Sequence, residues 1–375
     1  MYLTREEEPD LMRLLEWKES IALIGPRRAG KTTLAMRMLE IWKSRGNAGA
    51  YLDLEALGAP ATPAALLSEV EKVPEAGLVV LDEVQAVTGW VKVVRQDIER
   101  KTRRFIITGS SASLLSKEIA TSLAGRAVPE PILTLSYRDA RAWGLKSLRE
   151  YMDAGGYPEC VLRPEDASRL HKLYFELTVL RDVAARKGIR ETKPLSDLAL
   201  MILSEPGKTL AAKKTASMLG ISQPTFRSYM EAFNDAFLVL SVPPYLRSPR
   251  ERIVSDAKHY AYDVGMQKSV SVSLQQDEGR RLENVVAVEL VRRGYSLSYL
   301  KTDKGECDFI AQKAGSEALA VQVWGGEGKV PDREWSGLEA GMKAAKAKRL
   351  LLTLEPSETH TGVDAMTIES WLMKR

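Results

Sequence analysis

The segment Gly25–Thr32, GPRRAGKT, fills every fixed position of the pattern GxxxxGK[ST]. An apolar run, Ile21–Ile24, comes directly before it and predicts a buried strand, while Thr32–Trp42 predicts a helix after it. In this setting the glycines let the backbone wrap closely around a phosphate group, and the N–H groups of the loop add to the positive end of the helix. Because a chance glycine-rich turn would not need both flanking elements, we interpret the segment as a phosphate-binding loop.

The chemistry of this loop predicts how a nucleotide would be bound. Lys31 is expected to reach the β- and γ-phosphates of ATP, and Thr32 is expected to bind Mg²⁺ through its hydroxyl. The residues expected to contact the nucleotide are those of the loop and of its continuation into the helix: Gly25, Pro26, Arg27, Arg28, Ala29, Gly30, Lys31, Thr32 and Thr33. ATP and Mg²⁺ are therefore the predicted cofactors.

A second apolar run, Leu78–Leu81, predicts a strand that ends in two carboxylates, Asp82 and Glu83. Ligands of parallel sheets bind at the carboxyl ends of the strands, so both acids are expected near the loop. Asp82 is the predicted partner of Thr32 in holding Mg²⁺, and Glu83 is the predicted base that polarises the attacking water. A hydrolase needs this second acid, whereas a nucleotide-binding switch does not.

Two further side chains complete the predicted catalytic set. Ser110 follows the predicted strand Phe105–Thr108 and is expected to orient the water or the γ-phosphate, with Thr108 behind it; capping of the strand end is the alternative. Arg126 is a candidate arginine finger acting on the nucleotide of a neighbouring subunit, which would require a homo-oligomer. An ordinary surface arginine is the alternative interpretation of Arg126.

The rest of the first third of the chain also predicts a parallel sheet. Ala50–Leu54 is another apolar run, and continuous apolar strands that alternate with helices indicate a sheet covered on both faces. From about residue 147 to 203 the pattern becomes mainly helical. The 375 residues correspond to two or three domains at roughly 150 residues per domain.

Composition excludes several classes of protein. With 45% hydrophobic and 28% charged residues the chain is not disordered, and its apolar runs are far shorter than the roughly 20 residues of a membrane-spanning helix. Because there are only two cysteines, Cys160 and Cys307, a disulfide framework and a cysteine-based zinc site are excluded. The acidic N-terminus lacks the order of a signal peptide, so we expect a cytoplasmic protein with no membrane partner.

Taken together, these motifs resemble those of the prokaryotic AAA+-type ATPases that carry an uncharacterised C-terminal region. The matching segments are GPRRAGKT (25–32), LVVLDEVQAVTGW (78–90), ITGSSASLL (107–115), LAGRA (123–127), GGYP (155–158), LRDV (180–183), YAYDVGM (260–266), LENVVAVEL (282–290) and GECDFIA (305–311). The resemblance implies an α/β fold made of four parts. These parts are a P-loop NTPase parallel-sheet core of the AAA+ type (1–140), a helical lid (141–200), a winged helix (201–265) and an α/β restriction-endonuclease-like domain (266–375).

The stretch from about 208 to 232 has the pattern of a helix-turn-helix. If it binds DNA, Gln223, Thr225 and Arg227 would enter a groove. Lys213 and Lys214, in the preceding helix, would then contact phosphates. The alternative is a winged helix used for packing between domains.

The C-terminal region carries part of a restriction-type nuclease pattern. Such a site needs carboxylates from a helix and two strands to hold Mg²⁺, and a lysine to position the nucleophile. Glu283 is on the predicted helix and Asp308 on a predicted strand, but the next strand reads Gln322-Val323-Trp324 where E-x-K is needed. The sequence shows no other lysine at the expected place, so we interpret Glu283, Asp308 and Gln322 as a degenerate nuclease-like site.

Three functions follow from these patterns. The first is a Mg²⁺-dependent ATPase whose nucleotide state moves a C-terminal DNA-binding region. The second is a nucleotide-gated signalling switch that binds a protein partner and turns ATP over slowly. The third, an ATP-powered nuclease, is disfavoured because E-x-K is missing.

Overall fold

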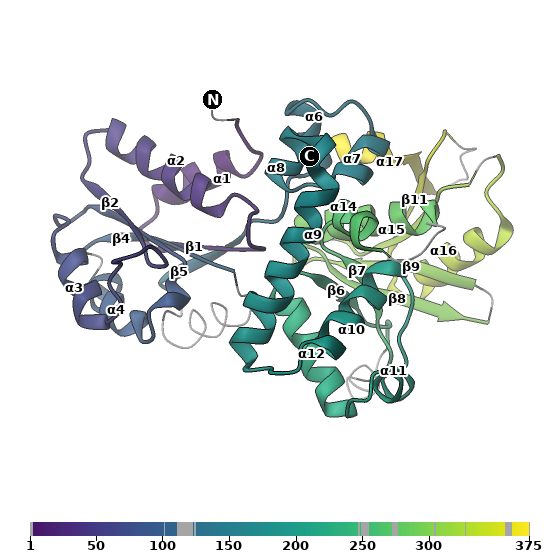
Figure 1. The fold of residues 1–375 in the computed structure, drawn as a ribbon. Coiled ribbons are helices and arrows are strands. Elements are labelled where there is room, and N and C mark those ends of the chain that lie inside the picture. Colours follow the sequence, from purple (N-terminus) through teal and green to yellow (C-terminus); the bar gives the residue numbers. More distant parts are fainter. Residues whose placement is uncertain are drawn as a thin grey trace. The chain divides into compact units, whose positions relative to one another are not determined.

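The computed structural model describes residues 3–100, 102–110, 123, 125–246, 248, 255–271, 277–303, 305–326, 328–356 and 362–374. The chain divides into two compact units (Figure 1). The first comprises Met1–Thr134 with Asp235–Phe237, and the second comprises Leu135–Asn234 with Leu238–Arg375.

A five-stranded sheet forms the centre of the first unit. Its strands are β1 (Ser20–Ile24), β2 (Gly49–Asp53), β3 (Leu78–Asp82), β4 (Arg104–Gly109) and β5 (Ala127–Pro131). The order across the sheet is β2-β3-β4-β1-β5, and every neighbouring pair is parallel. β1 and β3 are buried along their whole length. The predicted parallel α/β core is confirmed. It was predictable because strands that are buried on both faces appear in a sequence as continuous apolar runs.

Helices cover both faces of this sheet, with α1 and α2 on one side and α3 and α4 on the other (Figure 1). The helical elements of the first unit are α1 (Glu8–Leu15), α2 (Lys31–Ser44), α3 (Pro63–Glu71), the 3₁₀ turn η1 (Val84–Ala86) and α4 (Trp90–Arg100). Leu34 and Met38 of α2 pack with Leu23 of β1 and Val80 of β3 in one buried cluster. This packing fixes the start of α2 against the sheet, which is where the loop lies.

The second unit begins with helices. They are α6 (Tyr137–Ala142), α7 (Leu148–Ala154), α8 (Pro158–Leu162), the 3₁₀ turn η2 (Pro164–Asp166), α9 (Ala167–Leu177), the π-helical η3 (Thr178–Ala185), α10 (Lys193–Ser204), α11 (Ala212–Met218) and α12 (Gln223–Asp235). An antiparallel hairpin of β6 (Val239–Val242) and β7 (Lys258–Ala261) follows, and then α14 (Val264–Val270). Arg247, Arg250 and Arg252, between the two hairpin strands in the sequence, lie outside the described residues.

A second, mixed sheet completes this unit. Its strands are β8 (Ser296–Thr302), β9 (Gly305–Gln312), β10 (Leu319–Trp324), β11 (Lys348–Thr353) and β12 (Val363–Thr367), in the order β12-β11-β10-β9-β8. β8, β9 and β10 are antiparallel neighbours, whereas β10, β11 and β12 are parallel. The helices of this part are α15 (Glu278–Arg292), α16 (Asp332–Ala345) and α17 (Ile368–Met373).

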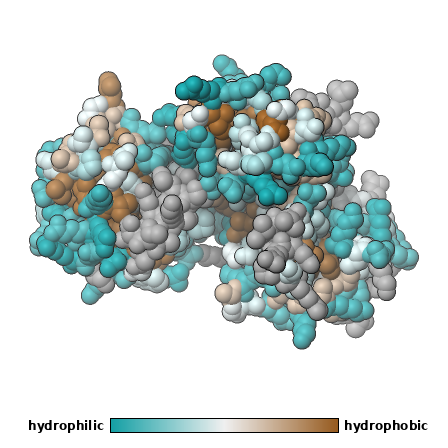
Figure 2. Space-filling model, turned by 90° about the horizontal axis from the view of Figure 1, so that it is seen from below, coloured by the Kyte–Doolittle hydropathy of each residue, from teal (hydrophilic) through white to brown (hydrophobic). Residues whose placement is uncertain are grey.

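The face of the molecule drawn in Figure 2 is mostly hydrophilic. On the face drawn in Figure 2, teal residues surround separate hydrophobic areas. Within the described ranges, none of the helices is both long and apolar enough to cross a bilayer.

Candidate functional site

The loop between β1 and α2 has a backbone that requires its glycines. A Cβ atom at Gly25 would lie 1.8 Å from the carbonyl oxygen of Ile132, so no larger residue fits there. Gly30 has φ +93°, a left-handed conformation that L side chains rarely adopt, and α2 begins at the next residue. The free N–H groups of the first turn of α2 therefore point towards the loop.

Lys31 is held over this loop. Its ammonium group donates hydrogen bonds to the carbonyl oxygens of Gly25 (2.9 Å) and Pro26 (2.8 Å). The residue is only 4% exposed. Lys31 therefore places a buried positive charge at the loop that the sequence predicts to hold phosphates.

Thr32 and Asp82, the two predicted Mg²⁺ ligands, are brought together. The Thr32 hydroxyl lies 2.8 Å from Oδ2 and 3.1 Å from Oδ1 of Asp82. Asp82 is the last residue of β3 and is 4% exposed. A hydroxyl and a carboxylate supply the oxygen ligands that Mg²⁺ prefers, so these residues fit the ion.

Two more hydroxyl groups fix the Asp82 carboxylate. The Tyr51 hydroxyl donates to Oδ2 at 2.7 Å, and the Thr108 hydroxyl donates to Oδ1. Burial raises the pKa of Tyr51 above its usual value, and the hydrogen bond to Asp82 raises it further. Tyr51 therefore stays a neutral donor, and the carboxylate is oriented from β2 and β4, the strands on either side of β3.

Glu83, the predicted base, has a strained backbone. Its φ and ψ are both 54°, in the left-handed region that non-glycine residues rarely adopt. Its N–H donates to the Thr108 hydroxyl at 3.0 Å, and its Oε2 accepts a hydrogen bond from Nε2 of Gln85 at 2.5 Å. Thr108 therefore fixes both acids, because it donates to Asp82 and accepts from Glu83.

The other predicted residues of this unit have different surroundings. Ser110 follows β4 and is 1% exposed, and its place at the γ-phosphate stays a prediction. The residue that is hydrogen-bonded to both acids is Thr108. Arg126 is 40% exposed and lies 3.8 Å from Glu99, and its role as a finger also stays a prediction. In the loop, Arg27 lies 3.5 Å from Glu55, and Arg28 has φ +64°.

Three residues near the loop were missed by sequence reasoning. The buried Arg5 donates to the carbonyl oxygens of Ala29 (2.5 Å) and Leu133 (2.9 Å) and so fixes the loop from the N-terminal segment. Tyr51 and Gln85 fix the two acids, as described above. Tyr51 had a weak signal, a hydroxyl within a predicted strand, whereas nothing local in the sequence marks Arg5.

The predicted nucleic-acid residues lie on α11 and α12. Lys213 and Lys214 are exposed on α11, and Gln223 and Arg227 are exposed on α12. Thr225 is half-buried, and its hydroxyl lies 2.8 Å from that of Ser222, which caps the start of α12. The four exposed side chains are therefore available to a partner, while the Thr225 hydroxyl is engaged in the cap.

The three nuclease-like residues also come together, on α15, β9 and β10. Oε1 of Gln322 accepts a hydrogen bond from the N–H of Asp308 at 3.4 Å, and Lys258 lies between Asp308 and Glu283. The sequence has no lysine at the E-x-K position, but in the structure Lys258 reaches both carboxylates. Lys258 comes from β7, which precedes the nuclease-like segment in the sequence, so residue spacing within that segment could not identify it.

Comparisons with known proteins match two segments of the chain. Residues 18–140 match the AAA domain family, and residues 145–277 match a domain of unknown function, DUF8612. An uncharacterized protein of Haemophilus influenzae is 29% identical, and the alignment covers 97% of this chain and 97% of that protein. The uncharacterized protein MJ1544 of Methanocaldococcus jannaschii is 33% identical over 64% of this chain and 59% of its own length.

Among solved structures, a point mutant of Thermotoga maritima RuvB is similar with a TM-score of 0.37 and 14% identity, covering 66% of this chain and 91% of that chain. AMPPCP-bound DnaA from Aquifex aeolicus is similar with a TM-score of 0.33 and 11% identity, covering 62% of this chain and 89% of that chain. Residues 18–140 are thus similar in sequence to the AAA domain, and they form a parallel sheet with a phosphate-binding loop between β1 and α2.

Proposed function

We propose that the protein binds ATP with Mg²⁺ and hydrolyses it, and that this cycle moves a C-terminal region that binds DNA. The observation that carries the ATPase part is the convergence of Thr32 and Asp82, with a hydroxyl-to-carboxylate distance of 2.8 Å, beside the buried ammonium of Lys31. This combination suits a triphosphate with its metal ion better than it suits an uncharged ligand.

Each residue has a distinct part in the proposed hydrolysis. The loop N–H groups and Lys31 bind the β- and γ-phosphates, and Thr32 and Asp82 hold Mg²⁺. The bound Mg²⁺ neutralises charge on the phosphate oxygens. Glu83 accepts the proton of the attacking water, and Thr108 keeps the backbone of Glu83 in place through its 3.0 Å hydrogen bond.

One contact favours the second candidate function, a nucleotide-gated switch with slow turnover. The Glu83 carboxylate accepts a hydrogen bond from Gln85 at 2.5 Å. As long as this bond persists, one oxygen of the base is occupied, and turnover is slow. An ATPase must release this oxygen when the nucleotide is bound, whereas a switch need not.

The DNA-binding part of the proposal is supported by α10, α11, α12 and the β6–β7 hairpin. Residue Thr209, between α10 and α11, forms a bridge with Lys258 of β7, so the segment before α11 joins the hairpin. This order of helices and strands supports the proposal of a winged helix, in which α12 would enter the groove. Lys213 and Lys214 on α11 would contact phosphates, and exposed Gln223 and Arg227 would face bases.

Replacing both Lys213 and Lys214 with alanine is expected to weaken DNA binding at all sequences. The slope of log K against log salt is negative, and each phosphate contact contributes about 0.9 to its magnitude. Losing two contacts should therefore reduce that magnitude by about two. The measurement is fluorescence anisotropy of labelled duplex, single-stranded and junction DNA over a series of salt concentrations. ATP hydrolysis measured with the same three forms should rise with the form that binds.

The matched control is Lys172→Ala with Lys187→Ala, which removes the same charge from two other exposed positions of the second unit. This control should keep the salt slope of the unaltered protein. Binding that is unaffected by salt and by the Lys213 and Lys214 changes would remove DNA from the proposal and favour the protein-binding switch.

A further inference from the structure

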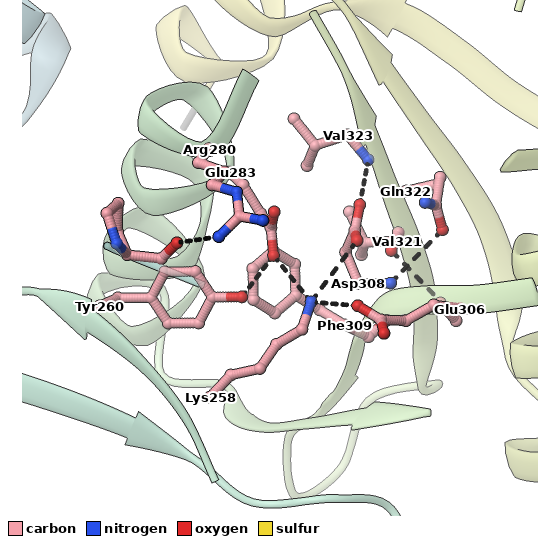
Figure 3. Close-up of polar contacts among 12 residues, drawn as sticks. Lys258, Tyr260, Arg280, Glu283, Glu306, Asp308, Phe309, Val321, Gln322 and Val323 are labelled. Carbon is pink, nitrogen blue, oxygen red and sulfur yellow. Dashed lines mark hydrogen bonds and ion pairs between the residues drawn. The ribbon is translucent and has the colours of Figure 1, made fainter. Parts of the chain in front are cut away.

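A lysine lies among three carboxylates in the second unit (Figure 3). The ammonium nitrogen of Lys258 is 3.0 Å from Oε1 of Glu283, 2.5 Å from Oε1 of Glu306 and 3.9 Å from Oδ1 of Asp308. The Lys258 side chain is 6% exposed, and those of Glu283 and Asp308 are 13% and 11% exposed. We call these four residues the Lys258 cluster.

Neutral donors fix the carboxylates around this ammonium group. The Tyr260 hydroxyl donates to Oε1 of Glu283, and the N–H of Val323 donates to Oδ2 of Asp308 at 2.9 Å (Figure 3). Glu283 comes from α15, and Asp308 and Glu306 come from β9. Glu283 and Asp308 are therefore each held by a neutral donor, and Lys258 reaches them from β7.

The amide of Gln322 does not take part in holding the cation. Its Oε1 accepts the N–H of Asp308 at 3.4 Å, and its Nε2 donates to Oε2 of Glu334 at 2.6 Å. Both ends of the amide are thus engaged elsewhere. In a restriction-type site this strand would add a second acid, which here is absent from β10.

The charges of the Lys258 cluster depend on one another. Burial disfavours the charged ammonium, but Glu283, Asp308 and Glu306 outweigh it and raise the pKa of Lys258 above its usual value. Three carboxylates gathered at one place need a cation, and the Lys258 ammonium supplies it at 3.0 Å from Glu283, 2.5 Å from Glu306 and 3.9 Å from Asp308.

We propose that the Lys258 ammonium is the resident cation of this cluster and takes the place of the divalent metal ion that a restriction-type nuclease holds. The ammonium lies against the same Glu283 and Asp308 carboxylates that would be the metal ligands. A metal ion and the ammonium therefore exclude each other. The ion pairs of Lys258 with Glu283 and Asp308 also link β7 to α15 and β9.

The test compares the full-length protein with the Lys258→Met variant, without nucleotide, using Tb³⁺ as the probe. Tyr260 donates to Glu283 and would sensitise the luminescence of a Tb³⁺ ion bound there. The variant should bind Tb³⁺ tighter than the unaltered protein by about tenfold or more, because three carboxylates then lack a cation. Adding Glu283→Gln and Asp308→Asn to the variant should abolish this gain.

Thermal unfolding gives a second readout. The Lys258→Met variant should unfold at a lower temperature than the unaltered protein, and Mn²⁺ should raise its Tm while leaving that of the unaltered protein unchanged. The matched control is Lys348→Met, which removes a lysine from an exposed pair with Glu317 and should gain no Tb³⁺ binding. If the Lys258→Met variant gains neither Tb³⁺ binding nor stabilisation by Mn²⁺, the proposal is overturned.

The unaltered protein provides a test that does not depend on the folding of a variant. The measurements are equilibrium dialysis with Mn²⁺ and a DNA cleavage assay in Mn²⁺. The unaltered protein and the Glu283→Gln variant should give the same result in both, because Mn²⁺ does not bind at the Lys258 cluster. Mn²⁺ binding or DNA cleavage that is lost in Glu283→Gln would mean that Lys258 accompanies a metal ion instead of replacing it, and would contradict the proposal.

Discussion

Replacing Lys31 with alanine is expected to abolish ATP hydrolysis and to weaken nucleotide binding by about hundredfold. The Lys31 ammonium is buried, and it donates to two carbonyl oxygens of the loop that is proposed to hold the phosphates. Removing one partner of a buried charge pair costs about 2–5 kcal/mol, and each 1.4 kcal/mol corresponds to about a tenfold change in affinity. Fluorescent-nucleotide titration and phosphate release measure the two effects separately.

Lys43→Ala is the matched control for this change. Lys43 is exposed in the last turn of α2, the helix that Lys31 begins, so both variants lose one lysine from one helix. Lys43→Ala should retain binding and turnover. Turnover by Lys31→Ala at a rate close to that of the unaltered protein would exclude the loop as the site of phosphate binding.

The Glu83→Gln variant is expected to bind ATP normally and to hydrolyse it about a hundred- to a thousandfold more slowly. General-base catalysis contributes about 10²- to 10⁴-fold, and an amide of the same shape cannot accept the proton of water. Because the Asp82 carboxylate and its hydroxyl donors are untouched, the affinity should be retained. Single-turnover kinetics should show a lower kcat at unchanged nucleotide affinity.

Glu75→Gln, at an exposed position before β3, is the control for the loss of one carboxylate. It should leave turnover unchanged. If the Glu83→Gln protein hydrolyses ATP as fast as the unaltered protein, Glu83 is not the base, and the Gln85 contact no longer bears on the choice between an ATPase and a slow switch.

The core was predictable because its signals are local. A strand buried on both faces in a parallel sheet is a short continuous apolar run, and β1 and β3 have that form in the sequence. The spacing of the phosphate loop fixes the start of α2 to within a residue. The sequence therefore predicts that Thr32 and Asp82 lie together, since the carboxyl ends of parallel strands meet at one edge, and in the structure they are 2.8 Å apart.

The residues that surround these acids were not predictable in the same way. Arg5 and Tyr51 contact the site from segments distant in sequence, and Thr108 had been placed behind Ser110. Lys258 shows the same limit most clearly. The E-x-K pattern places the nuclease lysine on the same strand as the acid. In this structure the lysine near Asp308 comes from the hairpin β6–β7, which is distant in sequence.

The most direct test of the proposed ATPase is a crystal structure of the protein with Mg²⁺ and a non-hydrolysable ATP analogue. We predict that the β- and γ-phosphates lie on the N–H groups of 25–32, with Mg²⁺ between the Thr32 hydroxyl and the Asp82 carboxylate. Nucleotide bound elsewhere, with the loop collapsed and Lys31 still bonded to the carbonyl oxygens of Gly25 and Pro26, would contradict the account.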